Sequence, residues 1–281
     1  MVDSILRKLS VFIPILLTIV LALSIIGNAS AQPSVGDYIV ANYGINELSK
    51  VTPDGTVTTI ASSGPGGPHG VAIDSSGNYI VTEIGSDELS KVTPGGTVTL
   101  ITSSLFGPVG VAIDGSGNYI VAELGSDELS KVTPGGTVTL IASGLSSPYD
   151  VAIDGSGNYI VTEYSSGELS KVTPGGTVTL IASGLSSPYG VAIDGSGNYI
   201  VAEYGSNELS KVTPGGTVTL IASSGLFYPR GVAIVPEPTT HPVGGIYAPI
   251  NKLNILAPYF ALVSLIGAIS MIFAIRKWRK D

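Results

Sequence analysis

The amino-acid sequence predicts an all-β fold: a five-bladed β-propeller of four-stranded antiparallel blades, with an N-terminal signal peptide and one C-terminal transmembrane helix. Three observations support this prediction. A unit of about 40 residues recurs five times, each unit contains short runs rich in Val, Ile, Thr and Tyr, and an apolar segment lies at each end of the chain. Frequent glycine (37 residues) and proline (18 residues) are typical of short strands joined by tight turns.

Four runs recur in each unit and are expected to be the strands of one blade. They read Gly-Val-Ala-Ile, Asn-Tyr-Ile-Val, Glu-Leu-Ser-Lys-Val-Thr and Gly-Thr-Val-Thr. Turn residues separate them, for example at residues 74–78 and 93–96, where glycine can adopt a positive φ. Four antiparallel strands per unit predict propeller blades. A stacked β-solenoid is the alternative, but it would leave uncapped sheet edges.

The two ends of the repeat region are out of phase. The first unit starts at its second strand, near Asp37, and its missing first strand appears at the end of the region as residues 231–234. We therefore expect residues 231–234 to pair with the first blade. This Velcro closure would join the ends of the ring and leave no open sheet edge.

The N-terminus reads as a signal peptide that ends at Ala31. Arg7 and Lys8 form a short basic region, residues 11–26 form an apolar core, and residues 29–31 provide the small side chains that signal peptidase requires. An uncleaved N-terminal anchor is the alternative.

The C-terminus predicts a membrane anchor. Residues 253–275 are almost entirely apolar and long enough for a hydrocarbon core of about 30 Å. A basic cluster with Trp278 follows, as expected on the cytoplasmic side, so the propeller should lie outside the cell. The expected order is a signal peptide (1–31), a lead-in (32–36), the propeller (37–234), a Pro/Gly-rich linker (235–252), the transmembrane helix (253–275) and a basic cytoplasmic tail (276–281).

Two resemblances accompany this organisation. The linker begins Val-Pro-Glu-Pro-Thr ahead of an apolar helix and a basic tail, which resembles the PEP-type sorting signals of some prokaryotic surface proteins. The helix context, Pro-Ile-Asn-Lys-Leu from Pro249 and Ala-Pro-Tyr from Ala257, resembles the surface-anchor tails common in archaea. That resemblance implies processing of the helix after export, whereas the plain interpretation is a permanent anchor. The run Pro-His-Gly-Val-Ala-Ile-Asp, starting at Pro68, resembles NHL-type repeats and the related streptogramin-lyase (virginiamycin B lyase) and gluconolactonase-type propellers. These families include hydrolases, lyases, receptors and binding modules, so the resemblance implies the fold over residues 37–234 and no single activity.

One face of the propeller is expected to carry an acidic rim. The loop that enters the innermost strand and the loop that leaves the second strand share this face. The residues that end the second strands are Glu83, Glu123, Glu163 and Glu203, with Asn42 in the first blade. The residues just before the innermost strands are His69, Val109, Tyr149, Tyr189 and Arg230. The next loops add Asp87, Glu88, Asp127, Glu128, Glu168 and Glu208.

The rim has two interpretations. The four glutamates could hold Ca²⁺ or Mg²⁺, or, together with Asn42, Tyr149 and Tyr189, bind a cationic or sugar ligand. Alternatively, each glutamate caps a turn of its own blade and faces solvent. The hairpin sequence Asp-x-Ser-x-Asn also imitates the start of a calcium loop, but it lacks the later bidentate glutamate.

Composition excludes several functions. The absence of cysteine excludes disulfides and thiol chemistry, and the two histidines, His69 and His241, exclude multi-histidine metal sites. The net charge of −8 argues against nucleic acid as a partner.

Two functions remain. The first is a membrane-anchored cell-surface binding or adhesion module with a protein or glycan partner, which the interchangeable repeats favour. The second, implied by the resemblance, is an exported metal-dependent lyase or lactonase. It would need the candidate catalytic residues His69 and Arg230, with Asn42 and Tyr43, to meet Glu83 or Glu203 on one metal ion.

Overall fold

A computed structural model describes residues 37–62 and 66–234 of the protein. By its contacts the chain divides into two units, Met1–Val235 and Pro236–Asp281, and the described residues all belong to the first. The predicted signal peptide, linker and transmembrane helix lie outside these residues. Within them, no helix is long and apolar enough to cross a membrane.

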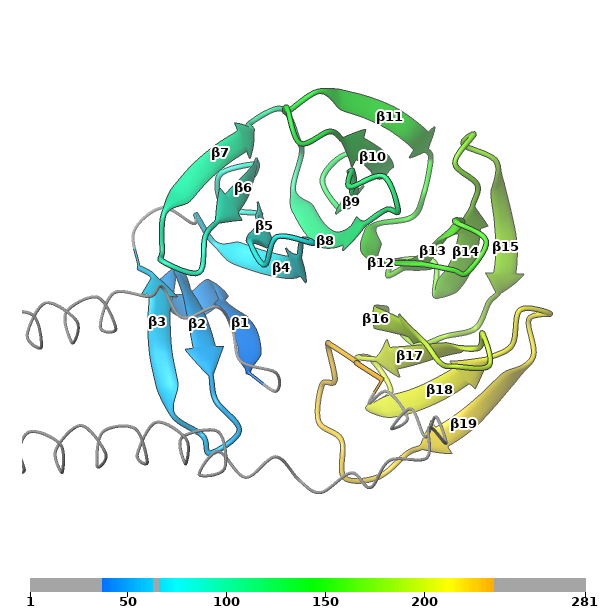
Figure 1. Ribbon diagram of the computed structural model, residues 1–281. Coiled ribbons are helices and arrows are strands. Elements are labelled where there is room, and N and C mark those ends of the chain that lie inside the picture. Colours follow the sequence, from blue (N-terminus) through cyan, green and yellow to red (C-terminus); the bar gives the residue numbers. More distant parts are fainter. Residues whose placement is uncertain (1–36, 63–65, 235–281) are drawn as a thin grey trace, which may run out of the picture. The chain divides into compact units, whose positions relative to one another are not determined.

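The described residues form five antiparallel sheets arranged as the blades of a propeller (Figure 1). The first contains β1 (Tyr38–Asn42), β2 (Glu47–Val51) and β3 (Val57–Ala61), with a 3-10 turn, η1 (Tyr43–Ile45), after β1. The second contains β4 (Pro68–Ile73), β5 (Tyr79–Glu83), β6 (Glu88–Val92) and β7 (Val98–Thr102). The third contains β8 (Pro108–Ile113), β9 (Tyr119–Glu123), β10 (Glu128–Val132) and β11 (Val138–Ser143). The fourth contains β12 (Pro148–Ile153), β13 (Tyr159–Glu163), β14 (Glu168–Val172) and β15 (Val178–Ala182). The fifth contains β16 (Pro188–Ile193), β17 (Tyr199–Glu203), β18 (Glu208–Val212) and β19 (Val218–Ala222).

The innermost strands of neighbouring blades lie side by side. In Figure 1, β4, β8, β12 and β16 surround the central axis and the fourth strand of each blade lies outermost. Glycine permits this approach, because a Cβ on Gly70 would lie only 2.3 Å from the carbonyl oxygen of Val109. The five-bladed propeller predicted from the repeats is therefore confirmed.

The hairpins that join the first and second strands are built by one aspartate each. Asp74 Oδ1 accepts hydrogen bonds from the backbone nitrogens of Ser76 and Asn78, both at 2.8 Å. Gly77 has the positive φ, 80°, that this turn requires. The same turn recurs at Asp114, Asp154 and Asp194.

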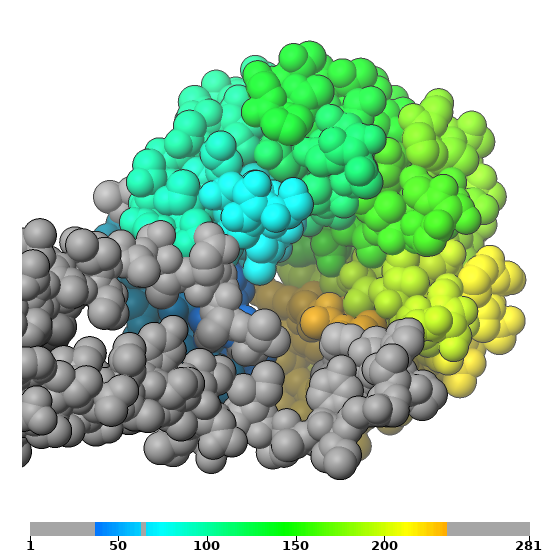
Figure 2. Space-filling view, in the orientation of Figure 1, coloured from blue at the N-terminus to red at the C-terminus, as the bar shows by residue number. Residues whose placement is uncertain are grey.

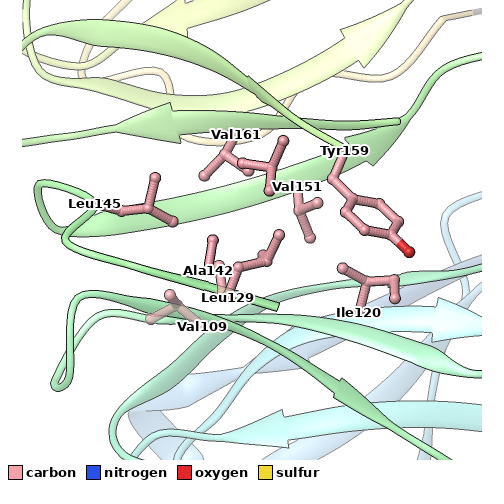
Figure 3. Packing of buried hydrophobic residues seen from close by; sticks show 10 residues of the cluster. Val109, Ile120, Leu129, Ala142, Leu145, Val151, Tyr159 and Val161 are labelled. Carbon is pink, nitrogen blue, oxygen red and sulfur yellow. The ribbon is translucent and has the colours of Figure 1, made fainter. Parts of the chain in front are cut away.

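The core lies between blades as well as within them. Figure 3 shows Val109, Ile120 and Leu129 of the third blade packed with Val151 and Tyr159 of the fourth. These side chains are nearly or fully buried, and their removal from water stabilises the blade interface. Burial raises the pKa of the Tyr159 phenol, and Asp114 of the preceding blade adds to the effect.

Polar contacts also join successive blades. Asp87, with a positive φ of 60°, accepts a hydrogen bond of 2.7 Å from the backbone nitrogen of Gly107 in the next blade. We call this contact the blade latch. It recurs from Asn46 to Gly67, from Asp127 to Ser147 and from Asn207 to Tyr228.

Two buried threonines add a second link. Thr82 Oγ1 accepts a hydrogen bond from the Gly70 nitrogen at 2.8 Å and donates to the Val109 carbonyl of the next blade at 2.6 Å. Thr162 makes the same link to the Tyr189 carbonyl.

The predicted closure of the ring needs correction. The first sheet has three strands, and residues 231–234 form no strand in the described part of the chain. The segment nevertheless starts in the expected place, because a Cβ on Gly190 would lie 2.4 Å from the Arg230 carbonyl oxygen. Every other innermost strand runs into an aspartate hairpin, whereas this copy runs into Val235 and a proline. The aspartate turn sequence that follows the other copies is therefore absent here, and proline has no N–H to donate.

Candidate functional site

A cavity lies at one end of the central channel, where the innermost strands begin. Its volume is about 350 Å³, at the lower end of the range for small-molecule sites. Figure 2 shows the blades following one another around the centre from cyan through green to yellow, with the orange end of the described chain beside the fifth blade. We call this cavity the channel mouth. Its lining includes His69, Val109, Tyr149, Tyr189 and Arg230.

These five mouth residues occupy one equivalent position, each directly before the first residue of the Gly-Val-Ala-Ile run or its Asp150 variant. From the sequence we predict that they lie on one rim, and in the structure all five line the same cavity. The strands beneath them are nearly identical, but these side chains differ from blade to blade. The mouth is therefore asymmetric although the scaffold is repetitive.

His69 and Tyr149 meet across the mouth. His69 Nε2 lies 2.8 Å from the Tyr149 hydroxyl oxygen, and the two rings pack edge to face. Burial lowers the pKa of His69, and the positive charge of Arg230 lowers it further. Burial and the contact with Tyr189 raise the pKa of Tyr149. Both groups are therefore neutral near pH 7, and the pair can donate and accept hydrogen bonds.

A chain of aromatic rings continues from Tyr149. Its ring centre lies 3.8 Å from that of Tyr189, which lies 4.8 Å from Tyr204, which lies 5.0 Å from Tyr228. Tyr164 packs beside Tyr149 and Tyr189. We call these five residues the tyrosine tract.

Sequence reasoning identified Tyr149 and Tyr189 but missed the other three members. A signal for two of them was present. Tyr164 and Tyr204 directly follow the rim glutamates of the fourth and fifth blades, where the second and third blades have Ile84 and Leu124. Tyr228 precedes Pro229, at the position of Gly67 and Gly107.

Arg230 lies over the tract. Its guanidinium carbon is 5.4 Å from the ring centres of both Tyr189 and Tyr204, within the range of a cation–π interaction. The ion pairs among the described residues are Lys50–Asp37 and Lys211–Asp194, and neither involves Arg230. Its side chain is exposed at the mouth.

Asp150 stands where the other copies of the innermost strand have glycine. Its Oδ1 accepts a hydrogen bond from the Val151 nitrogen at 2.9 Å, and its Oδ2 accepts one from the Val191 nitrogen of the next blade at 3.0 Å. Burial raises the pKa of this carboxyl to about 6, although the two N–H groups act in the opposite direction.

The rim glutamates are structural in this arrangement. Glu123, Glu163 and Glu203 each accept a hydrogen bond of 2.7 Å from a backbone nitrogen 17 residues earlier, in the loop that enters their own blade. Glu83 does the same for Gly66 at 2.5 Å. All four side chains are nearly or fully buried. This matches the capping interpretation, except that the carboxylates are enclosed by the loop instead of facing solvent.

The remaining candidates lie in other surroundings. Asn42 donates a hydrogen bond to the Ser49 hydroxyl at 3.1 Å, and exposed Tyr43 lines the channel mouth. Asp87 and Asp127 form blade latches. Among residues 37–62 and 66–234, no three His, Asp or Glu side chains are grouped so that they could hold a metal ion. His241 lies outside these ranges. The residues that begin the third strands are Glu88, Glu128, Glu168 and Glu208.

Comparison with known proteins shows which solved structures share this fold. No protein-family model matches the chain, and no curated protein matches its sequence. Virginiamycin B lyase from Staphylococcus aureus matches the structure with a TM-score of 0.61 and 18% identity, over 72% of this chain and 71% of the lyase. The chain shares its fold. A gluconolactonase from Xanthomonas campestris matches with a TM-score of 0.60 and 14% identity, over 69% of this chain and 73% of that protein.

A third match concerns a variant of the same lyase. A catalytically inactive form, in which alanine replaces a histidine, was solved with quinupristin and matches with a TM-score of 0.62 and 17% identity, over 72% of this chain and 71% of that one. At such identities the likeness concerns the fold alone.

Proposed function

We propose that this protein is a membrane-anchored cell-surface module that binds a ligand, a glycan or a protein of the cell's surroundings, at the channel mouth. One observation carries the proposal. The five mouth residues differ from repeat to repeat, and they converge on one cavity. A purely structural repeat has no need of such variation, whereas a binding site requires different groups on its different sides.

The expected topology supports a role outside the cell. The signal peptide expected at 1–31, the apolar segment at 253–275 and the basic tail support a propeller on the outer side of the membrane. Protease added to intact cells should release fragments of residues 37–234 while an epitope on residues 276–281 stays protected. A propeller that is protected until the cells are lysed would overturn the topology.

Binding is tested with the full chain in detergent micelles against a glycan array that contains neutral, acidic and amino sugars, and against proteins of the cell envelope. Binding at the mouth should be lost in Tyr189→Ala and retained in Tyr79→Phe, which changes a buried tyrosine of the blade interface. A ligand that binds both variants alike would place the site elsewhere. If nothing in either set binds, the proposal fails.

A second candidate is an exported lyase or lactonase. It is supported by the fold shared with virginiamycin B lyase and gluconolactonase, and by the neutral His69–Tyr149 pair, in which the imidazole can accept a proton. The donor set does not fit a metal ion, because the rim glutamates are bonded to their own loops and the described residues contain no group of three ligands.

The enzymatic candidate therefore rests on His69 as a base. Incubation with quinupristin and, separately, with glucono-1,5-lactone should give a product that mass spectrometry detects with the native chain and not with His69→Ala. Turnover that is equal in the two proteins would exclude His69 as the base. Absence of turnover with both substrates would leave the binding module as the function.

A further inference from the structure

The channel mouth has two chemically different sides. The fourth and fifth blades line it with Tyr149 and Tyr189, which belong to the tyrosine tract, whereas the second and third blades line it with His69 and Val109. Tyr149, Tyr189 and Tyr204 are half-buried and Tyr228 is 63% exposed. The tract therefore keeps ring surface available after the blades have packed.

Tyrosine rings combine an apolar face with a polar hydroxyl tip. A pyranose ring has the matching distribution, because its C–H groups form an apolar face and its hydroxyls lie around the edge. The neutral His69–Tyr149 pair adds a donor and an acceptor that can serve such hydroxyls. The aromatic side of the mouth thus suits a sugar better than it suits an extended peptide.

The positive charge at the mouth comes from Arg230. The five repeat lysines lie on β2, β6, β10, β14 and β18, and none of them lines the mouth. The carboxylate in the lining, Asp150, directs its oxygens to the backbone nitrogens of Val151 and Val191. Among the described residues no carboxylate pairs with Arg230.

An arginine held over two aromatic rings presents a planar fork of donors that matches a carboxylate. The same charge repels a cationic ligand, so an aromatic cage for an ammonium group does not fit this site. The observations together call for a ligand that offers a ring face, hydroxyls and one negative charge.

We propose that the channel mouth binds a uronic acid unit of an acidic glycan, with its ring against Tyr149 and Tyr189 and its carboxylate on Arg230. This inference rests on the proposed binding function and specifies its ligand class. The cavity, about 350 Å³, accommodates about one sugar ring, so the rest of the glycan extends into solvent.

The test uses trigalacturonic acid and a hyaluronan tetrasaccharide, each compared with its neutral methyl ester, by isothermal titration calorimetry on the full chain in detergent micelles. At least one acid should bind saturably with one site per chain, and its ester should bind at least tenfold more weakly. Raising the salt concentration should weaken the binding of the acid and leave the binding of the ester unchanged.

Variants separate the contributions. Arg230→Gln should weaken the binding of the acid at least tenfold, so that the acid binds no better than its ester. Arg230→Lys should recover part of this lost affinity. Lys131→Gln, which removes a positive charge on β10, should bind like the native chain. Because Arg230 is exposed, Arg230→Gln is expected to keep the native melting temperature, which rules out loss of fold as the cause.

Two results would overturn the inference. If acid and ester bind equally, or if neither acid binds while a neutral sugar or a protein does, the carboxylate has no role, yet the proposed binding function stands. If no glycan and no envelope protein binds at all, the inference and the proposed function fall together.

Discussion

The side-chain oxygen Oδ1 of Asn207 lies 2.6 Å from the backbone nitrogen of Tyr228. This contact repeats the blade latch that joins Asp87 to Gly107 and Asp127 to Ser147. Tyr228 also shares the positive φ of the residues at this position, 49° in its own case. The end of the described chain is therefore held to the fifth blade as though a further blade followed, although residues 231–234 form no strand and do not pair with β1.

Removing this latch should loosen the segment that carries Arg230. In Asn207→Ala the Tyr228 N–H loses its partner, at a cost of about 1 kcal/mol, which corresponds to a roughly fivefold faster local hydrogen exchange. Exchange measured by mass spectrometry should rise over residues 225–231 and stay unchanged in β8 and β12. The matched variant Asp87→Ala should affect residues 105–109 instead. Uniform acceleration in both variants would show that the latches act globally.

The buried threonine of the second blade should contribute to stability. Thr82→Ala leaves the Gly70 N–H and the Val109 carbonyl without their shared partner, and we expect a loss of about 1–3 kcal/mol in the free energy of unfolding. Urea denaturation measures it, and Thr99→Ala on the exposed outer strand serves as the control, with a change near zero. A loss as small as that of the control would mean that water replaces the threonine hydroxyl.

The rim glutamates should behave as caps. Glu163→Ala removes the acceptor of the Ser146 N–H, and the expected loss of unfolding free energy is about 1–3 kcal/mol. Glu163→Gln keeps an oxygen in place and should lose less. Ligand binding at the channel mouth, measured by calorimetry, should remain within about twofold of the native value in the glutamine variant. A loss of binding at unchanged stability would instead show that Glu163 takes part in ligand binding.

Asp150 should make stability depend on pH. Its pKa, about 6 in the folded protein, lies above the ordinary value of 3.8, so the folded state holds the proton more tightly than the unfolded state. The free energy of unfolding should therefore fall as the pH rises from about 4 to about 6, by up to about 3 kcal/mol.

Asp150→Gly, which restores the residue of the other repeats, removes this dependence. The difference in unfolding free energy, variant minus native, should become more positive between pH 4 and pH 7. His69 titrates in both proteins and cancels in the difference. A difference that stays constant across this range would mean that the carboxyl is well solvated in the folded state.

Much of the fold could be predicted from the sequence, because the residues that form the turns recur in each unit. The aspartate at residue 74 and the glycine at residue 77 define a hairpin that the structure contains, and β5 and β6 begin where the recurring Tyr and Glu begin. The convergence of the five mouth residues could also be predicted from the repeats, because equivalent positions in a propeller lie at equivalent distances from its axis.

What escaped prediction depends on contacts between distant parts of the chain. The burial of Glu163 results from a loop that folds over it and donates from Ser146, which no local pattern reveals. The tyrosine tract combines residues of two blades with Tyr228, so its continuity exists only in three dimensions. The prediction of a closing strand was wrong, because it relied on the phase of the repeats and took no account of the sequence after residue 234, which lacks the aspartate turn motif of the other copies.

The mouth positions have a further consequence. Latches, caps and blade packing hold the backbone of the innermost strands, and of the five mouth side chains Val109 alone is buried in the core. The other four positions, here His69, Tyr149, Tyr189 and Arg230, can therefore carry different side chains without a change in the core of the scaffold. A different set of ligand-binding groups could be installed by point substitutions at these four positions, which makes this propeller a practical starting framework for engineered recognition.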